Sequence, residues 1–414
     1  MNESLATQTK RQPRVMMLIT ALTFGGAETQ VVRLALELKS RGWSVSVASM
    51  LPPFAYVSAL VSEGIQVRSL NMKRGVPDPR AILRLASLLR ELRPDVVHSH
   101  MVHANLLGRM TRLVRNVPVL VCTAHNYRET SESGGPTWHK ELLYRLTDFL
   151  ADRTTIVSQA AFDRYVRVGA VPRARLELVP NGVDTRTFAP SGEMRRRARK
   201  SFDVADSTFV WLTVGRLVEQ KDYPNLFAAL RLIAHLNWIL LIAGEGPLHS
   251  QLLTMAAAMG IADRVRFLGA REDIVDIYSA ADAYVSSSSF EGLSSALLEA
   301  SSMGLPCAVT DVGGNGDVVQ QEKSGYLVPP HDSAGLADAM RKIMEADETR
   351  RAAFGIAARQ HCVDNYRFES VAERWIHLYQ RLLPREQLSQ NGARPAPDGH
   401  AKSTQAGPLQ GAQE

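Results

Sequence analysis

Short apolar runs alternate along the chain with longer segments in which apolar residues recur at helical spacing. In the first half the runs are Val15–Thr20, Ser44–Ser49, Val96–Ser99, Leu120–Thr123 and Thr154–Val157. In the second half they are Phe209–Val214, Trp238–Ala243, Val265–Leu268, Ala283–Ser286 and Cys307–Thr310. Strands interleaved with amphipathic helices are typical of doubly wound parallel sheets. We therefore predict an α/β protein with two Rossmann-like domains.

The two series of strands divide after the segment Asn181-Gly182-Val183-Asp184. The stretch 191–200, with arginines at 195, 196 and 197, reads as a charged linker or the start of a helix, and Phe368–Leu383 as a final amphipathic helix. Beyond Pro384 the chain is rich in Gln, Gly, Ala, Pro and Ser, which predicts disorder. The expected organisation is a flexible terminus 1–13, a first domain 14–186, a linker 187–205, a second domain 206–366, a helix 367–385 and a disordered tail 386–414.

Length and composition agree with two globular domains. The chain has 414 residues, of which 45% are hydrophobic and 22% charged, enough for two domains of about 180 residues. Three cysteines, Cys122, Cys307 and Cys362, cannot all pair, which favours a reducing compartment. The first 13 residues are polar, and no apolar run approaches the roughly 20 residues of a membrane-spanning helix. We expect a cytoplasmic protein with no span.

Positive charge is concentrated in the first half. Residues 1–190 contain 25 Lys and Arg against 15 Asp and Glu, a net charge of +10, which leaves −4 for residues 191–414. Arg109, Arg112 and Arg115 lie at helical spacing, and Arg84, Arg90 and Arg93 lie on the preceding amphipathic segment. Such a face can attract an anionic membrane or a lipid-diphosphate acceptor, or it can be a basic surface without a partner. No aromatic-studded basic strand accompanies the charge, so we expect no nucleic-acid partner.

Two glutamates bracket a helix start in the run Phe290-Glu291-Gly292-Leu293-Ser294-Ser295-Ala296-Leu297-Leu298-Glu299-Ala300. Ser294 and Ser295 are good N-cap residues, which places Glu291 in a loop and Glu299 inside the helix. Free N–H groups at a helix start suit a diphosphate, and carboxylates accept hydrogen bonds from sugar hydroxyls. By itself such a pair also flanks many surface helices that bind nothing.

Two cations follow the strand that ends at Val214, in the run Gly215-Arg216-Leu217-Val218-Glu219-Gln220-Lys221. Arg216 and Lys221 can neutralise a departing diphosphate without a metal ion. The alternative is a solvated loop with ordinary charges. The glutamate pair downstream favours the first interpretation.

At this point the chain resembles the family 4 retaining glycosyltransferases, whose fold is GT-B. Five further stretches match that family in order: Phe24-Gly25-Gly26-Ala27-Glu28, Val97-His98-Ser99-His100, Thr123-Ala124-His125-Asn126, Val179-Pro180-Asn181-Gly182-Val183-Asp184 and Ala243-Gly244-Glu245-Gly246-Pro247. The resemblance covers roughly residues 14 to 385.

The resemblance implies a role for each site residue. Arg216 and Lys221 would grip the donor diphosphate, Glu299 the ribose and Glu291 the transferred sugar. Gly25 and Gly26 would approach the donor phosphates from the first domain, and His125 would lie beside the sugar on the acceptor side. The donor loop would comprise Gly292, Leu293, Ser294 and Ser295. The chain departs from the family at Leu293-Ser294, where Phe-Gly is common, and at Asp317, where glutamate is frequent, which leaves the donor sugar open.

Other chemistries fit less well. A dinucleotide-dependent oxidoreductase needs Gly-x-Gly-x-x-Gly after its first strand, whereas Gly25-Gly26-Ala27-Glu28 lacks the third glycine. His98, His100 and His103 are close in sequence, but His98 and His100 share one face of a strand end, where structural roles are common. The chain has no Asp-x-Asp pair, so we expect transfer without a metal or cofactor. His125 can also be a structural histidine.

We therefore expect a retaining glycosyltransferase that moves a sugar from a nucleotide diphosphate donor, with UDP the commonest base in similar proteins. The acceptor would be a lipid-linked sugar or polysaccharide of a bacterial surface glycan. Three alternatives keep the same fold: a nucleotide-sugar epimerase, a phosphorylase, for which we find no cofactor lysine, and a noncatalytic subunit. Peripheral association with the inner face of the plasma membrane would follow from the basic first domain.

Overall fold

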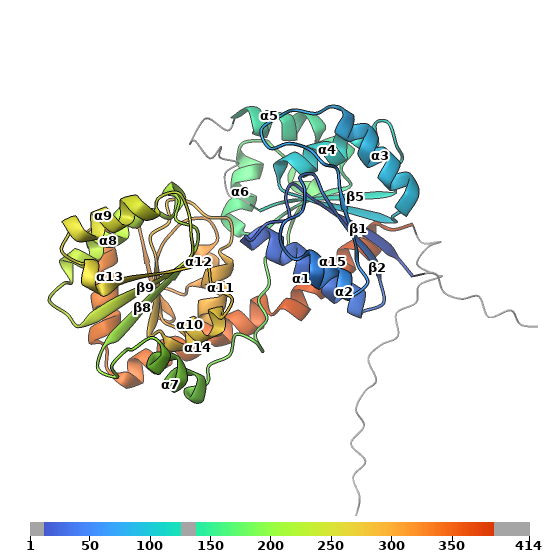
Figure 1. Cartoon of the computed structure of the whole chain (residues 1–414). Helices are drawn as coiled ribbons and strands as arrows, with labels where there is room; N and C mark the ends of the chain where they lie inside the picture. Colours follow the sequence, from blue (N-terminus) through green and yellow to red (C-terminus); the bar gives the residue numbers. More distant parts are fainter. Residues whose placement is uncertain (1–11, 126–137, 385–414) are drawn as a thin grey trace, which may run out of the picture.

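The computed structural model of the chain describes residues 12–125 and 138–384. Two α/β domains stand side by side, each built around one parallel sheet (Figure 1). The predicted tail 386–414, and the predicted flexible terminus apart from residues 12 and 13, lie outside the described residues. Two Rossmann-like domains were the fold predicted from the sequence, and the structure confirms it.

The amino-terminal domain has a seven-stranded sheet in the order β3-β2-β1-β4-β5-β6-β7. Its central strands are buried on both faces, which explains why they read as continuous apolar runs. The strands are β1 (Arg14–Ile19), β2 (Ser44–Ser49), β3 (Gln66–Ser69), β4 (Val96–His100), β5 (Val119–Ala124), β6 (Arg153–Ile156) and β7 (Leu176–Leu178). The helices are α1 (Gly26–Ser40), α2 (Val57–Ser62), α3 (Arg80–Leu92), α4 (Val102–Arg112), α5 (Trp138–Thr147) and α6 (Gln159–Arg167), with 3-10 turns η1 (Asp148–Leu150) and η2 (Arg173–Arg175).

The carboxy-terminal domain has a six-stranded sheet in the order β10-β9-β8-β11-β12-β13. The strands are β8 (Phe209–Val214), β9 (Trp238–Ala243), β10 (Val265–Gly269), β11 (Ala283–Ser286), β12 (Cys307–Thr310) and β13 (Gly325–Val328). The helices are α7 (Gly192–Ser201), α8 (Tyr223–Leu232), α9 (His249–Ala258), α10 (Ile274–Ala280), α11 (Ser295–Ser302), α12 (Asn315–Val318), α13 (Ser333–Glu345) and α14 (Glu348–Tyr366), with η3 (Glu219–Lys221) and η4 (Ala262–Arg264). Helix α7 occupies much of the stretch expected as a linker and packs on α10.

Two chain segments cross between the domains and hydrogen-bond to each other. The backbone N–H of Val183 donates to the carbonyl of Tyr366 (2.8 Å), and the N–H of Phe368 donates to the carbonyl of Val183 (2.9 Å). A Cβ atom on Gly182 would lie 2.9 Å from the Cα of Phe368, so the crossing requires glycine there. From α1, the side-chain amide of Gln30 holds both the N–H (2.9 Å) and the carbonyl (2.8 Å) of Gly182. We call these paired segments, 181–183 and 366–368, the hinge.

Beyond the hinge, the last helix, α15 (Phe368–Leu382), returns to the amino-terminal domain (Figure 1). It contacts α1, and its apolar residues join the same core as β1, β2 and α1. Those residues include Val371, Trp375, Leu378 and Tyr379. The amino-terminal domain is therefore completed by residues far away in sequence.

Candidate active site

Helices α1 and α11 begin opposite each other across the two domains. Gly25 is the N-cap of α1, and Ser294 is the N-cap of α11, with its hydroxyl accepting from the N–H of Leu297 (3.3 Å). A Cβ atom on Gly26 would lie 3.3 Å from Oγ of Ser295. The first turn of each helix has N–H groups without a partner in the preceding turn of the helix, and the positive end of each helix dipole lies at this point. The position is suited to an anion such as a diphosphate.

Lys221 and Glu291 form an ion pair in the carboxy-terminal domain. Nζ of Lys221 lies 2.6 Å from Oε1 of Glu291, and both side chains are largely buried. The same carboxylate accepts from the Ser288 hydroxyl (2.8 Å) and from Nε2 of Gln220 (3.4 Å). Two residues singled out from sequence are thus brought into contact, and Gln220 and Ser288, which sequence reasoning missed, help to hold the carboxylate.

Arg216 is exposed at the end of β8, and its positive charge acts on Glu28 of α1. Burial raises the pKa of Glu28, while hydrogen bonds and the charge of Arg216 oppose the rise. The Thr23 hydroxyl donates one of those hydrogen bonds (3.1 Å). Glu28 was quoted in the Gly25-Gly26 motif but was not predicted to be a site residue. Its signal was an acidic residue in the first turn of a glycine-capped helix.

Glu299 lies inside α11 and is shared between the domains. Its Oε2 accepts from the Tyr278 hydroxyl (3.1 Å), and its Oε1 lies 3.9 Å from Nη2 of Arg33 on α1. Burial raises the pKa of Glu299 to about 7, although the Arg33 charge and the Tyr278 hydrogen bond lower it. Arg33 and Tyr278 are two further neighbours that the local sequence pattern did not indicate.

His125 directly follows β5, at the carboxyl end of that strand. Its Nε2 lies 3.1 Å from Nδ1 of His100, and its Nδ1 has no hydrogen-bond partner among the described residues. Burial lowers the pKa of His125 to about 4, so the ring is neutral at physiological pH. A neutral imidazole can hydrogen-bond to a substrate hydroxyl but supplies no cationic charge.

The histidines near β4 do not form a metal site. Both ring nitrogens of His98 are engaged, with the Tyr379 hydroxyl (2.7 Å) and the Thr123 hydroxyl (2.6 Å). His103 lies outward on α4. In the ranges 12–125 and 138–384, no group of three or more His, Cys, Asp or Glu side chains is arranged to hold a metal ion.

The loop between β11 and α11 is fixed from both sides. Gly313 has φ +55°, and a Cβ atom there would lie 2.1 Å from the carbonyl oxygen of Glu291, so only glycine fits. The N–H of Gly314 donates to the carbonyl of Gly292 (2.7 Å), and Nδ2 of Asn181 donates to the carbonyl of Leu293 (2.9 Å). Asp317 faces the other domain, where its carboxylate accepts from the N–H of Gln159 (2.8 Å).

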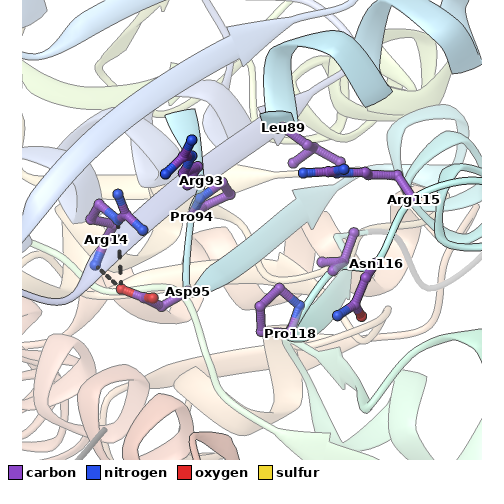
Figure 2. Close-up of a pocket in the computed structure, with 9 residues that line it drawn as sticks. Arg14, Leu89, Arg93, Pro94, Asp95, Arg115, Asn116 and Pro118 are labelled. Carbon is purple, nitrogen blue, oxygen red and sulfur yellow. Dashed lines mark hydrogen bonds and ion pairs between the residues drawn. The ribbon is translucent and has the colours of Figure 1, made fainter. Parts of the chain in front are cut away.

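Two hollows in the protein differ in place and size. One of about 20 Å³ lies at the domain junction and is lined by residues that include Gln30, His100, His125 and Asn181. The other, about 360 Å³, lies at the opposite, amino-terminal end of the strands and is lined by Arg14, Arg93, Arg115 and their neighbours (Figure 2). Ligands of open α/β sheets bind at the carboxyl ends of strands. The smaller hollow therefore lies at the end of the amino-terminal sheet where a ligand is expected, and of the predicted site residues it is lined by His125.

The basic face predicted from sequence is only partly formed. Arg109 is fully buried, 4.6 Å over the ring of Tyr144, and donates to the hydroxyl of Thr154 (2.7 Å). It also lies 3.4 Å from the Asp148 carboxylate. Arg84 and Arg112 pair with acidic neighbours, Asp78 and Asp152. The prediction that Arg109 contributes to a solvent-facing basic surface was wrong, because the helical spacing of the arginines does not show what packs over each one.

Two facing Rossmann-like domains with convergent helix starts, a Lys–Glu pair and a carboxylate at the junction define a GT-B glycosyltransferase. Residues 24–187 match the sequence family described as Glycosyltransferase Family 4, and residues 194–361 match the family described as Glycosyl transferases group 1. Relatives support the same assignment. The chain is 31% identical over 378 residues to a D-inositol 3-phosphate glycosyltransferase of Geodermatophilus obscurus, covering 81% of this chain and 80% of the relative. The chain therefore belongs to the family 4 glycosyltransferases, as its motifs predicted, and it is a hexosyltransferase-type enzyme.

Another relative and a solved structure extend the comparison. The UDP-Gal:alpha-D-GlcNAc-diphosphoundecaprenol alpha-1,3-galactosyltransferase of Escherichia coli is 30% identical over 280 residues, 65% of this chain and 71% of the relative. Anabaena HepE in complex with UDP-glucose superposes with a TM-score of 0.76 at 20% identity, covering 89% of this chain and 99% of HepE. The name of the E. coli relative gives UDP-galactose as its donor and a GlcNAc-diphosphoundecaprenol as its acceptor. Among the residues that the structure describes, no helix is both long and apolar enough to cross a bilayer.

Proposed function

We propose that this enzyme transfers a hexosyl group from a UDP-sugar to a lipid-linked acceptor in bacterial surface glycan synthesis, with retention of the anomeric configuration. The observation that carries the proposal is the meeting of the α1 and α11 helix starts beside the Lys221–Glu291 pair and Glu299. A diphosphate can lie at the helix starts, while the carboxylates accept from sugar and ribose hydroxyls. The E. coli relative names a UDP-linked donor and a diphosphoundecaprenol acceptor, which supports this choice.

Each site residue has a role in the proposal. Arg216 and Lys221 bind the donor diphosphate, Glu299 the ribose and Glu291 the sugar. Gly25 and Gly26 admit the phosphates against α1, the loop of Gly292, Leu293, Ser294 and Ser295 encloses the donor, and His125 hydrogen-bonds on the acceptor side. In the structure Lys221 is paired with Glu291. Donor binding therefore replaces this pair with contacts of Lys221 to phosphate and of Glu291 to sugar hydroxyls.

The proposed reaction needs neither a metal nor a covalent enzyme intermediate. The bond from the anomeric carbon to the diphosphate breaks, and the acceptor hydroxyl oxygen attacks the same face of the sugar. The acceptor proton passes to the departing diphosphate oxygen. Arg216, Lys221 and the two helix starts stabilise the negative charge that develops there. Closure of the domains at the hinge excludes water during transfer.

A thermal-shift panel of UDP, GDP, ADP and their sugars tests the donor. A ligand at about 100 times its Kd stabilises the native state by about 2.7 kcal/mol. We expect UDP and one UDP-sugar to raise the melting temperature, and Glu299→Ala to abolish the shift. Glu345→Ala, an exposed glutamate on α13, should keep it. A shift with GDP or ADP alone would overturn the UDP assignment, and hydrolysis or isomerisation of the donor without an acceptor would favour an epimerase.

Product stereochemistry tests the mechanism separately. With an α-linked donor and an acceptor sugar on a lipid diphosphate, the NMR coupling of the new anomeric proton should be that of an α-linkage. A β-linked product would overturn retention while leaving the donor assignment intact.

We further propose that the enzyme works at the cytoplasmic face of the plasma membrane, where a lipid-linked acceptor is held. The basic amino-terminal domain supports this location, since anionic lipids attract it.

A further inference from the structure

A stripe of large apolar side chains runs along the outer side of α5 and into η1. Trp138, Leu142, Leu146 and Phe149 follow each other at intervals of four, four and three residues, which places them on one helical face. Their exposed fractions are 65%, 42%, 59% and 70%. Leu143, also exposed, lies beside them. Contiguous apolar surface of this kind marks an interaction site rather than ordinary solvent-facing surface.

The inner face of α5 accounts for the packing of the helix and leaves the stripe unused. Tyr144 is fully buried, and its hydroxyl accepts from Nδ2 of Asn105 (2.7 Å). The carbonyl of Tyr144 and the hydroxyl of Thr147 accept from Arg109 (3.2 Å each). These contacts fix the rotation of α5 so that the stripe faces outward.

Within residues 138–150, the exposed charge beside the stripe is positive. The two acidic residues between positions 138 and 150 are Glu141 and Asp148, and both are neutralised by arginines of the domain. Glu141 pairs with Arg164, and Asp148 pairs with Arg175 (2.7 Å). Arg145, in contrast, is exposed next to Leu146. A helix with an apolar stripe and flanking cations is typical of a segment that lies in the headgroup region of an anionic bilayer.

The direction of α5 relative to the active site also fits a docking role for the stripe. Helix α5 leads from β5, which ends beside His125, back to the start of β6, so its first turn lies towards the cleft. Two contacts agree with this direction. Lys140 acts electrostatically on His103 in the first turn of α4, and Arg112 at the end of α4 donates to the carbonyl of Leu150 (3.0 Å). Figure 1 shows α5 at the outside of the amino-terminal domain.

We propose that the outer face of α5 and η1 docks on an anionic lipid bilayer and holds the acceptor side of the cleft at the membrane surface. The proposal rests on the lipid-linked acceptor of the proposed function, and it replaces the α3 and α4 arginines as the docking surface. Apolar side chains enter the headgroup region, and Arg145 meets lipid phosphates. A second copy of the chain is the competing occupant of the same face.

Vesicle sedimentation tests the docking face. The full chain is mixed with vesicles of phosphatidylglycerol and phosphatidylcholine, or of phosphatidylcholine alone. We expect binding to the anionic vesicles, weakened by salt. Leu146→Glu should reduce the partition coefficient at least about tenfold, since a buried leucine contributes 1.5–3 kcal/mol. Arg145→Glu should reduce it at least about fivefold, at about 1 kcal/mol per cation.

Leu83→Glu is the matched control, because Leu83 is 67% exposed on α3 beside Arg84. It should bind vesicles like the wild type. Loss of binding in Leu83→Glu with retention in Leu146→Glu would overturn the proposal in favour of α3. Phe149→Gln provides a second stripe variant, and circular dichroism with the UDP thermal shift checks that each variant is folded.

Two further outcomes separate this inference from the proposed function. If UDP raises the melting temperature but the wild type binds no anionic vesicles, the docking face is wrong and the donor assignment stands. If the wild type binds anionic vesicles but no nucleotide raises the melting temperature, the docking face stands and the donor assignment is wrong. Light scattering of the wild type and of Leu146→Glu tests whether a second copy of the chain occupies the stripe. A wild-type dimer that dissociates in the variant, with vesicle binding unchanged, would assign the stripe to a second copy.

Discussion

Arg33 of α1 contacts the other domain, and its Nη2 atom lies 3.9 Å from Oε1 of Glu299 on α11. The same guanidinium stands 5.8 Å from the centroid of the Phe188 ring. It therefore lies in front of the carboxylate that we assign to the donor ribose. If Glu299 binds the ribose as proposed, donor binding and the Arg33 contact compete for one group, so the contact favours the ligand-free state.

Removing Arg33 should tighten donor binding. A partly exposed ion pair contributes about 0.5–1 kcal/mol, so Arg33→Ala should lower the Kd of UDP roughly two- to fivefold. Isothermal titration calorimetry measures this directly. Arg41→Ala, at the exposed end of the same helix, should leave the Kd unchanged. Weaker UDP binding by Arg33→Ala would show instead that Arg33 contacts the donor.

Lys221→Met should separate catalysis from stability. The substitution leaves the Glu291 carboxylate with only the Ser288 and Gln220 hydrogen bonds, which should cost roughly 3–5 kcal/mol of unfolding free energy. Turnover should fall by about 100-fold or more, because a charge that stabilises the leaving group is lost. Adding Glu291→Gln should recover most of the stability and none of the turnover.

Urea denaturation and steady-state rates measure the two effects of the Lys221 substitution. The exposed Lys342→Met on α13 serves as control and should change neither. If Lys221→Met keeps full turnover, Lys221 does not bind the diphosphate.

The lowered pKa of His125 should make its contribution to stability depend on pH. The native ring takes up a proton near pH 4, whereas the unfolded chain does so near pH 6.5. Stability from the neutral ring is therefore complete above pH 6.5 and is lost as pH falls towards 4. The unfolding free energy of the wild type relative to His125→Gln should fall by about 1.4 kcal/mol per pH unit in that window. Urea titrations at several pH values test this, and a difference independent of pH would contradict it.

The hinge should not tolerate a side chain at position 182. A methyl group there would press on the Phe368 backbone at 2.9 Å, and overpacking of this kind costs about 1–3 kcal/mol. Gly182→Ala should therefore lower the midpoint of urea unfolding. Gly192→Ala is the control, since a Cβ atom there would lie no closer than 3.8 Å to the Arg196 side chain and would meet only its far end. Equal midpoints for both variants would mean that the hinge can shift to make room.

The sequence predicted the interior of each sheet better than its edges. The ten predicted strands all exist, whereas β3, β7 and β13 were not predicted. All three lie at an edge of a sheet. An edge strand is covered less completely, and β3, for example, reads Gln-Val-Arg-Ser with no buried residue, so its composition carries little hydrophobic signal.

In the candidate site, too, the contacts that could not be predicted from the sequence are those between segments far apart in the chain. The helix start at Ser294 followed from local capping rules. By contrast, the proximity of Glu28 to Arg216 and of Arg33 to Glu299 depends on how the hinge orients the domains. The burial of Arg109 depends on Tyr144, Asp148 and Thr154, which lie at least 35 residues away. Helical spacing alone carries no information about such partners.

The return of α15 to the first domain has a consequence for biosynthesis. Trp375, Leu378 and Tyr379 belong to the core formed by β1, β2 and α1. As the ribosome adds residues from the amino terminus, that apolar surface stays uncovered until the whole second domain has been translated. The second domain can fold as its own strands emerge, whereas the first must wait for the last helix. The half of the enzyme that is made first is therefore finished last, and a nascent chain stalled before α15 would be a natural client for chaperones.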